Sequence, residues 1–350
     1  MITVEVNASK SYQVIIGSGL LPQLGQRTAA LCKPKKAAIV SDSNVFPLYG
    51  STVKQSLFDA GIETVEFVFP AGEESKNGNV YLNLVNFLAQ NHLTRTDCLI
   101  ALGGGVVGDM TGFAAATYLR GIRYIQVPTT LLAAVDSSVG GKTAIDLPAG
   151  KNLCGAFCQP ELVLCDIDSL NTLPEEIFRD GCAEVIKYGI LYDEGLFSRL
   201  SREGLDFHRS EVIARCVELK RNVVMEDEFD TGARMKLNLG HTVGHGVEAA
   251  SNYQTSHGKA VAIGTAIISR AAEAQGYCSK ATTEAVIAIL TQFGLPTACD
   301  YAAETLMDSV LSDKKRAGDT VKLIVPRTIG QCHICPVPVD KLLPFIKAGL

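Results

Sequence analysis

The sequence predicts an α/β domain, Rossmann-like with a mostly parallel sheet, followed by a mainly α-helical domain. Two observations carry this prediction. Short apolar runs alternate with helical stretches over the first ~170 residues, and helical periodicity dominates from about residue 172 to about 310. We therefore expect an α/β domain over residues 1–172, a mainly helical domain over 173–350, and an active site in the cleft between them. The 350 residues, 47% of them hydrophobic, supply enough apolar material for two cores.

The predicted strands of the first domain are short apolar runs bounded by polar or glycine-rich turns. They cover residues 3–6, 37–40, 64–69, 98–102, 122–127 and 162–165, and the helices between them include 51–60, 78–91 and 106–119. Residues 136–160 are polar and rich in glycine, which predicts a long connecting loop of the kind that often has a function. In open α/β sheets, ligands bind beyond the carboxyl ends of the strands, so the turns there are the expected binding positions.

The second domain opens with Thr172-Leu173-Pro174-Glu175, which has the pattern of a helix capping box with proline in the first turn. Late in the chain, apolar runs at 320–325 and 332–337 flank a turn that contains proline and glycine, and we predict a small hairpin there. Cys332 and Cys335 fall in its second run. A single CxxC without a second pair of ligands indicates packing rather than a metal or redox site.

Composition excludes several classes of function. The chain has 32 Lys+Arg against 37 Asp+Glu, a net charge of −5 that is spread evenly, so neither a nucleic acid nor a membrane is an expected partner. No apolar run approaches the ~20 residues that cross a bilayer, and the first residues lack the pattern of a signal peptide. Eleven cysteines, an odd number without a secretion signal, favour a reducing compartment, and we expect a cytoplasmic protein.

A glycine-rich turn follows one predicted strand and opens a helix. Its sequence is GGGVVGD at 103–109. Glycine lets the backbone approach a pyrophosphate, and the helix N-terminus supplies amide donors and a favourable dipole. The motif lies away from the first strand and lacks an acidic residue ~20 positions downstream, so a tight turn without a ligand is the alternative. Asp42 and Glu73, at other strand ends, could bind ribose hydroxyls instead.

His241 and His245 lie one helical turn apart in the sequence, and His257 follows 16 residues after His241. Upstream, Asp180, Glu184 and Lys187 form a polar stripe on an otherwise apolar helix. Two imidazoles and one carboxylate are a common zinc set that keeps an open position for catalysis. For any single histidine, a hydrogen-bonded structural role is the alternative. Thr242 stands where a zinc peptidase of the HExxH type carries glutamate, which excludes that class.

A third group of residues is cationic or amide-bearing and suits a phosphate or carboxylate ligand. For each lysine, a solvated surface charge is the alternative. Two of them lie in the glycine-rich connection, and an arginine and an asparagine directly precede the histidine pair. The group comprises Lys142, Lys151, Asn152, Lys187, Lys220, Arg234, Asn238, Lys314 and Lys315.

Taken together, these motifs resemble those of the 3-dehydroquinate synthase family, within the sugar phosphate cyclases. The resemblance covers the whole chain in order, and it rests on GGVVGD (104–109), PTTLLA (128–133), DSSVGGKT (136–143), GKN (150–152), EVIKYG (184–189) and NLGHTVGH (238–245). It implies an enzyme that uses NAD and a divalent metal, zinc or cobalt. The implied reaction closes 3-deoxy-D-arabino-heptulosonate 7-phosphate into 3-dehydroquinate by transient oxidation, phosphate elimination, reduction, ring opening and aldol cyclisation, a step of the shikimate pathway.

The resemblance also implies roles residue by residue. Glu184, His241 and His257 would ligate the metal, with catalytic roles for Lys142, Asn152, Asp136, Lys187 and the proton-relay residue His245. Lys142, Asn152 and Asn238 would meet the substrate phosphate, together with Lys314 or Lys315, while Lys220 and Arg234 would meet the substrate carboxylate. Lys151 would lie near both the cofactor and the substrate. Arg120 would reach the phosphate of a neighbouring subunit, which implies a homodimer. The NAD site would comprise Asp42, Asn44, Glu73, Glu74, Ser75, Lys76, Gly104, Gly105, Val106, Val107, Gly108, Asp109, Thr129, Thr130, Lys142, Lys151 and Thr172.

Three alternatives stay open at this stage. Another sugar phosphate cyclase, such as a 2-deoxy-scyllo-inosose synthase or a sedoheptulose phosphate cyclase, would share the NAD and metal residues but act on a substrate without a carboxylate. A polyol dehydrogenase of the glycerol dehydrogenase type would release NADH. A non-catalytic metal- or nucleotide-binding protein is disfavoured, because the glycine turn, the metal set and the anion-binding residues occur together.

Overall fold

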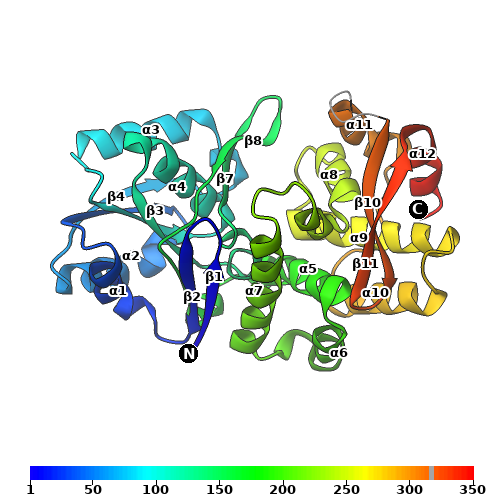
Figure 1. Cartoon of the computed structure of the whole chain (residues 1–350), viewed down its shortest axis with the longest axis horizontal. Helices are drawn as coiled ribbons and strands as arrows, with labels where there is room; N and C mark the ends of the chain where they lie inside the picture. The colour runs from blue at the N-terminus through cyan, green and yellow to red at the C-terminus, as the bar shows by residue number, and fades with distance from the viewer. Residues whose placement is uncertain (315–318) are drawn as a thin grey trace. The chain divides into compact units, whose positions relative to one another are not determined.

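The computed structural model describes residues 1–314 and 319–350, with the backbone alone for 309–314. Its chain divides into two compact units, coloured along the sequence in Figure 1. Unit 1 comprises Met1–Pro174 with Arg209–Phe229, and unit 2 comprises Glu175–His208 with Asp230–Leu350. The chain first leaves unit 1 two residues beyond the expected boundary at 172. The sequence pattern did not predict that helix α7 (Arg209–Glu226) belongs to unit 1.

Unit 1 is built on a sheet of seven strands in the order β1-β2-β9-β6-β5-β3-β4. β1 pairs antiparallel with β2, and the other neighbouring pairs are parallel, so the predicted mostly parallel sheet is confirmed. Each predicted strand matches an observed one to within two residues, whereas β2 was not predicted. The strands are β1 (Ile2–Asn7), β2 (Ser11–Gly17), β3 (Lys36–Asp42), β4 (Glu63–Phe69), β5 (Cys98–Gly103), β6 (Arg123–Pro128) and β9 (Leu162–Asp166).

Helices cover both faces of this sheet. Ile39 of β3 shares a core cluster with Leu57 of α2 (Phe46–Asp59), on the side that also carries α1 (Leu24–Leu31). The next residue, Val40, belongs to a second cluster with Leu84 of α3 (Gly78–Gln90), on the side of α4 (Gly105–Thr117). Consecutive strand residues point to opposite faces, so the two clusters are the two faces of one sheet (Figure 1). All six residues of β5 are buried, as expected for a strand covered on both sides.

The segment 136–160 is not the long loop that the sequence predicted. It contains an antiparallel hairpin of β7 (Lys142–Leu147) and β8 (Gly150–Phe157). Only Thr143 and Ile145 of β7 are buried, and no residue of β8 is. Strands this exposed lack the apolar alternation by which a strand is recognised, which is why the prediction failed.

Unit 2 is mainly helical, as predicted, and its late hairpin of β10 (Thr320–Thr328) and β11 (Gln331–Pro338) is also confirmed. The first helix begins at Glu175, so Thr172 is not its N-cap; the Thr172 hydroxyl donates to Ser169 O at 3.2 Å instead. The helices are α5 (Glu175–Tyr192), α6 (Glu194–Glu203), α8 (His241–Ala250), α9 (His257–Ala274), α10 (Lys280–Gln292), α11 (Ala303–Lys314) and α12 (Val339–Lys347).

Two further features bear on the setting of the chain. Among the described residues, no helix combines the length and apolar character needed to cross a membrane. All eleven cysteines are described and carry free thiols.

Candidate active site

Several predicted NAD-binding segments lie at one edge of the sheet in unit 1. Asp42 ends β3, residues 73–76 follow β4, the glycine turn follows β5, and Thr129 and Thr130 follow β6. Because these strands are parallel neighbours, their carboxyl ends meet at the same edge. The fold therefore gathers segments that are up to ~90 residues apart in the sequence, at the edge where α/β sheets bind ligands.

The glycine turn leaves the start of α4 accessible to an anion. Gly104 is the N-cap of α4 and supplies no side chain to cap its first amides. A Cβ at Gly104 would lie 3.0 Å from Thr130 Cγ2, so the turn and the segment after β6 approach closely. The Thr129 hydroxyl is buried without a hydrogen-bond partner among the described residues. An uncapped helix N-terminus beside an unpartnered hydroxyl fits a pyrophosphate-containing cofactor such as NAD.

Lys76 joins three segments of the predicted NAD site. Its Nζ lies 2.6 Å from Asp109 Oδ2 on α4 and donates to Asn152 Oδ1 at 2.6 Å. Asn152 has a left-handed backbone, with φ at 57°, and its N–H donates to Asp146 Oδ1 at 2.7 Å. Since Lys76 is only 5% exposed, this contact fastens the β7–β8 hairpin to α4 through one buried ammonium.

The charges around Lys76 explain its protonation. Burial acts to lower the Lys76 pKa, but the charges of Asp109 and Glu73 outweigh it and raise the pKa above 10.5. Burial likewise raises the pKa of Asp109 above 3.8, although the Lys76 charge opposes that rise. The Lys76 ammonium and the Asp109 carboxylate therefore each favour the ionised form of the other where both are buried away from water.

The remaining NAD candidates in unit 1 are held by local contacts. Asp42 Oδ1 accepts from the N–H groups of Asn44 and Val45, both at 2.9 Å. Glu73 Oε1 lies 3.6 Å from Lys151 Nζ. The Ser75 hydroxyl donates to Pro70 O at 2.5 Å, Glu74 is exposed, and the Thr172 hydroxyl lies 2.5 Å from the hydroxyl of Tyr49. Val106, Val107 and Gly108 form the first turn of α4.

Lys220 and Asp136, predicted at substrate-binding and catalytic positions, form a pair within unit 1. Lys220 Nζ, from α7, donates to Asp136 Oδ1 at 2.5 Å and to Asp136 O at 2.6 Å. Lys220 is 6% exposed, whereas Lys142, at the start of β7, is exposed. Helix α7 packs against β1, β2 and the π-helical segment Ala133–Ser137, and this packing brings Lys220 to Asp136.

The predicted metal ligands come together in unit 2. One donor atom each from Glu184 on α5, His241 at the start of α8 and His257 at the start of α9 lie within 4.8 Å of one another. The Nε2 atoms of His241 and His257 are each 3.5 Å from Glu184 Oε1. The structure therefore brings these three residues to one position. Three protein ligands leave coordination positions for a substrate or water.

The hydrogen-bonding of the imidazoles suits metal binding. His241 Nδ1 lies 3.0 Å from Leu239 O, and His257 Nδ1 lies 3.5 Å from Glu248 Oε1. With Nδ1 turned to an oxygen in both rings, Nε2 is the nitrogen that faces Glu184, as in metal sites whose histidines are oriented by a second partner. The donor set therefore fits a divalent metal such as Zn²⁺ or Co²⁺.

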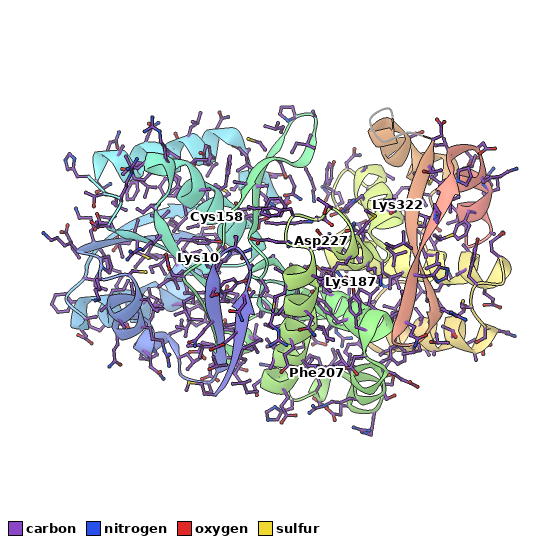
Figure 2. All side chains as sticks on the ribbon, in the orientation of Figure 1. Lys10, Cys158, Lys187, Phe207, Asp227 and Lys322 are labelled. Atoms are coloured by element: carbon purple, nitrogen blue, oxygen red, sulfur yellow. The ribbon has the colours of Figure 1, made fainter. Side chains whose placement is uncertain are left out.

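The two histidines differ in basicity. Burial, aided by the charge of Lys187, lowers the pKa of His241 to about 3. Burial acts in the same direction on His257, but the contacts with Glu184 and Glu248 outweigh it and raise its pKa to about 10. Only neutral imidazole binds a metal, so metal uptake at His257 displaces a proton. Lys187, labelled in Figure 2, is 2% exposed and forms an ion pair with Glu184 one turn earlier on α5.

Two acidic residues around the metal cluster were missed as site residues. Asp180, noted only as part of a polar stripe, accepts hydrogen bonds from the first turn of α9. Glu248, which faces His257, was not singled out. The available signal was its position seven residues after His241 on a predicted helix, which places both on one face.

The other predicted residues have the following places. Arg234 is buried in the 3₁₀ helix Ala233–Asn238, which ends at Asn238, shortly before α8. The ring centre of His245 is 5.7 Å from that of His241. Arg120 is exposed in unit 1. Lys315 and the side chain of Lys314 lie outside the described residues.

The two cysteines of the late hairpin are placed as packing residues. Burial raises the pKa of Cys332 to about 12, and its Sγ donates to Ile190 O at 3.6 Å; Cys335 is buried.

Comparison with known proteins gives the family. A model described as 3-dehydroquinate synthase N-terminal matches residues 66–180, and one described as 3-dehydroquinate synthase C-terminal matches 181–316. The 3-dehydroquinate synthase of Streptococcus suis is 45% identical over 343 residues, which cover 96% of this chain and 97% of the relative. The chain belongs to the 3-dehydroquinate synthase family. The resemblance drawn from the motifs is confirmed, and the C-terminal 3-dehydroquinate synthase match includes all three residues of the metal cluster.

Solved structures of other sugar phosphate cyclases have the same fold as this member of the 3-dehydroquinate synthase family. A 2-epi-5-epi-valiolone synthase from Streptomyces hygroscopicus, with NAD⁺ and Zn²⁺ bound, is 26% identical with a TM-score of 0.88, covering 99% of this chain and 97% of that one. A 2-deoxy-scyllo-inosose synthase complexed with carbaglucose-6-phosphate, NAD⁺ and Co²⁺ is 24% identical with a TM-score of 0.90, covering 100% of both chains. The second likeness shows the fold alone.

Proposed function

We propose that the chain is an NAD- and divalent-metal-dependent 3-dehydroquinate synthase that converts 3-deoxy-D-arabino-heptulosonate 7-phosphate to 3-dehydroquinate and phosphate. The observation that carries the proposal is the meeting of Glu184, His241 and His257 donor atoms within 4.8 Å. An open three-ligand site is what a reaction on substrate hydroxyl and carbonyl oxygens needs. Family membership at 45% identity supports the choice of substrate.

NAD and a divalent metal would share the chemistry with the protein. When bound, NAD⁺ would supply a hydride acceptor and the metal would supply polarisation of substrate oxygens. The start of α4 would donate amide hydrogen bonds to the cofactor pyrophosphate, and the residues at the neighbouring strand ends would hold its riboses. Lys76 would keep Asp109 and Asn152 in place beside that cofactor, because it touches both.

The substrate carries a phosphate and a carboxylate, and the proposed binding residues are matched to these groups. Lys142, Lys151, Asn152 and Asn238 would hold the phosphate, whose departure needs its charge stabilised. Lys220 and Arg234 would hold the carboxylate, the group that distinguishes this substrate from a simple sugar phosphate. Fixing both ends of a flexible substrate places its reacting carbon atoms in one geometry, which supplies a large part of the rate.

Proton movements are assigned to residues beside the metal ligands. His245, one helical turn after His241, would relay protons to and from substrate oxygens through its ring nitrogens. Lys187 would balance the charge of Glu184 with its ammonium, because the two are paired and both are buried.

The experiment supplies the heptulosonate phosphate with NAD⁺ and Zn²⁺ or Co²⁺, and follows inorganic phosphate and the carbocyclic product. We expect phosphate and 3-dehydroquinate in equal amounts without accumulation of NADH, because the hydride returns in each turnover. Steady release of NADH would instead indicate a polyol dehydrogenase. Phosphate release from a hexose phosphate that lacks a carboxylate, and not from the heptulosonate, would indicate another sugar phosphate cyclase, the class to which the two solved structures belong.

A cytoplasmic location and a homodimer complete the proposal. In the dimer, Arg120 would reach the substrate phosphate bound by the partner subunit. Its position supports this role: Leu119, Arg120 and Gly121 all have positive φ angles, at 52°, 65° and 131°, in the turn that ends α4. Such a turn is costly for leucine and arginine, and strained turns are often retained for function. Arg120 is exposed within its own unit, as a residue that acts on another subunit must be.

A further inference from the structure

The backbone around His257 and its ring are contacted by residues from two other helices, α5 and α8. His257 is the first residue of α9, where a helix frays most easily, and its ring approaches Glu184 on α5. We propose that Asp180 and Glu248 are positioning residues for the metal, which together fix the backbone and the ring of His257. This inference rests on the metal dependence proposed above, and no role is assigned to either carboxylate in the substrate chemistry.

Asp180 fixes the backbone. Its Oδ1 accepts from the Ser256 hydroxyl at 2.5 Å and from Lys259 N at 2.9 Å, and its Oδ2 accepts from Gly258 N at 3.1 Å. These contacts surround His257 on both sides along the chain. Ser256 is the N-cap of α9, but its hydroxyl makes no capping bond of its own, so Asp180 satisfies the first amides of the helix instead.

The helix cap that Asp180 supplies links two of the proposed metal ligands, Glu184 and His257. Asp180 lies on α5 one turn before Glu184, so the helix that supplies one ligand also holds the helix start that supplies another. The approach is close: a Cβ at Gly258 would lie 2.0 Å from Asp180 O, and only glycine fits there. A cap made by Ser256 itself would satisfy the same amides without fixing the distance between α5 and α9.

Glu248 fixes the ring. It is 3% exposed on α8, two turns after His241, and its Oε1 lies 3.5 Å from His257 Nδ1. A carboxylate at Nδ1 holds the proton there and leaves Nε2 to the metal. The arrangement is therefore the same twice: α5 carries Glu184 and Asp180, α8 carries His241 and Glu248, and each helix gives one residue to the metal and one to His257.

The test measures metal affinity in the absence of substrate. Apo protein is titrated with Co²⁺ against a competing chelator, the visible absorption spectrum of bound Co²⁺ reports the coordination geometry, and melting of the apo protein reports stability. Asp180→Ala and Glu248→Gln should each weaken Co²⁺ binding about 10- to 100-fold and change the spectrum. The matched control is Glu176→Gln, which removes an exposed ion pair to Lys259 in the same turn of α9 and should change affinity less than about twofold.

The outcomes separate the possibilities. A merely structural role would lower the melting temperature of the apo variant while leaving the Co²⁺ affinity and spectrum of the folded protein unchanged, and that result overturns the inference for the residue concerned. If Asp180→Ala does not fold, Asp180→Asn, which keeps Oδ1, takes its place with an expected loss of at least about threefold; unchanged affinity again overturns the inference. Failure of the parent protein to bind Co²⁺ would instead contradict the proposed metal dependence.

Discussion

Replacing Lys76 by methionine tests how the predicted NAD site is held together. Methionine keeps most of the side-chain volume and removes the ammonium that lies 2.6 Å from both Asp109 Oδ2 and Asn152 Oδ1. The Asp109 side chain, 17% exposed, would then lie without the cation that favours its ionised form. We expect Lys76→Met to destabilise unit 1 and to weaken NAD binding.

The magnitude follows from the burial of the pair. Removing one partner of a buried ion pair costs about 3–5 kcal/mol, and the partial exposure of Asp109 places the effect near the lower end, at about 3 kcal/mol. Lys54→Met is the matched control, because it breaks an ion pair with Glu66 at the surface, where such pairs contribute at most about 1 kcal/mol.

The pKa of Asp109 determines how the stability loss of Lys76→Met changes with pH. Burial already raises the pKa of Asp109 above 3.8 in the folded chain, and loss of the Lys76 charge raises it further. A carboxyl group with a raised folded pKa binds its proton more tightly in the folded state, so its contribution to stability is complete below 3.8 and is lost as the pH rises through the folded pKa. The deficit of Lys76→Met should therefore be larger at about pH 8 than at about pH 5.

The assay is urea unfolding followed by far-ultraviolet circular dichroism, because the chain contains no tryptophan. NADH fluorescence reports cofactor affinity in parallel. A loss no greater than that of Lys54→Met, or a deficit that stays constant between the two pH values, would refute the idea that Lys76 compensates a buried carboxylate.

Three further predictions concern the packing of α9 against α8, the proposed dimer and the proposed metal. Gly264→Ala should destabilise unit 2 by about 1–3 kcal/mol in urea unfolding, because its Cβ would lie 2.0 Å from Gly240 O at the start of α8; Gly78→Ala, which meets nothing within 4 Å, should be neutral, and equal effects would contradict the reasoning. Mixing inactive Arg120→Ala and Lys142→Ala subunits should restore up to about a quarter of parental activity, since one site of each mixed dimer would have both residues; no recovery from subunits that have been refolded together would contradict the proposed role of Arg120 across the dimer. Removal of the metal with a chelator should abolish turnover and added Zn²⁺ or Co²⁺ should restore it, whereas full activity of the chelated protein would exclude a metal in catalysis.

Much of the fold was predictable because its signals are local. The central strands β3, β5, β6 and β9 are short, apolar and almost entirely buried, so each appears in the sequence as an apolar run bounded by turns. The metal cluster was predictable only in part: the residue pattern indicated two histidines with one carboxylate, and the resemblance to the family named Glu184, His241 and His257. The β7–β8 hairpin lacked such a signal, because Ile145 is the only buried apolar residue that its two strands contain.

The return of α7 to unit 1 and the contacts of Asp180 could not be predicted in the same way. Both depend on which surface a helix packs against, and the amphipathic pattern of a helix does not name its partner. The contact between Lys220 and Asp136 spans 84 positions, and that between Asp180 and Ser256 spans 76. Such pairs follow from tertiary packing, so they cannot be predicted from a single sequence taken alone.

Contacts that depend on tertiary packing also change the electrostatic description of the predicted binding residues. The sequence suggests a cluster of free cations that await an anionic substrate. In the structure, three predicted site lysines of unit 1 have acidic partners: Lys76 has Asp109, Lys151 has Glu73 and Lys220 has Asp136. An anion that binds there meets cations whose positions are already fixed, so less conformational entropy is lost on binding than with unpaired lysines. Each acidic partner also reduces the positive charge that the anion encounters, and specificity then depends on the geometry of the donors more than on their number.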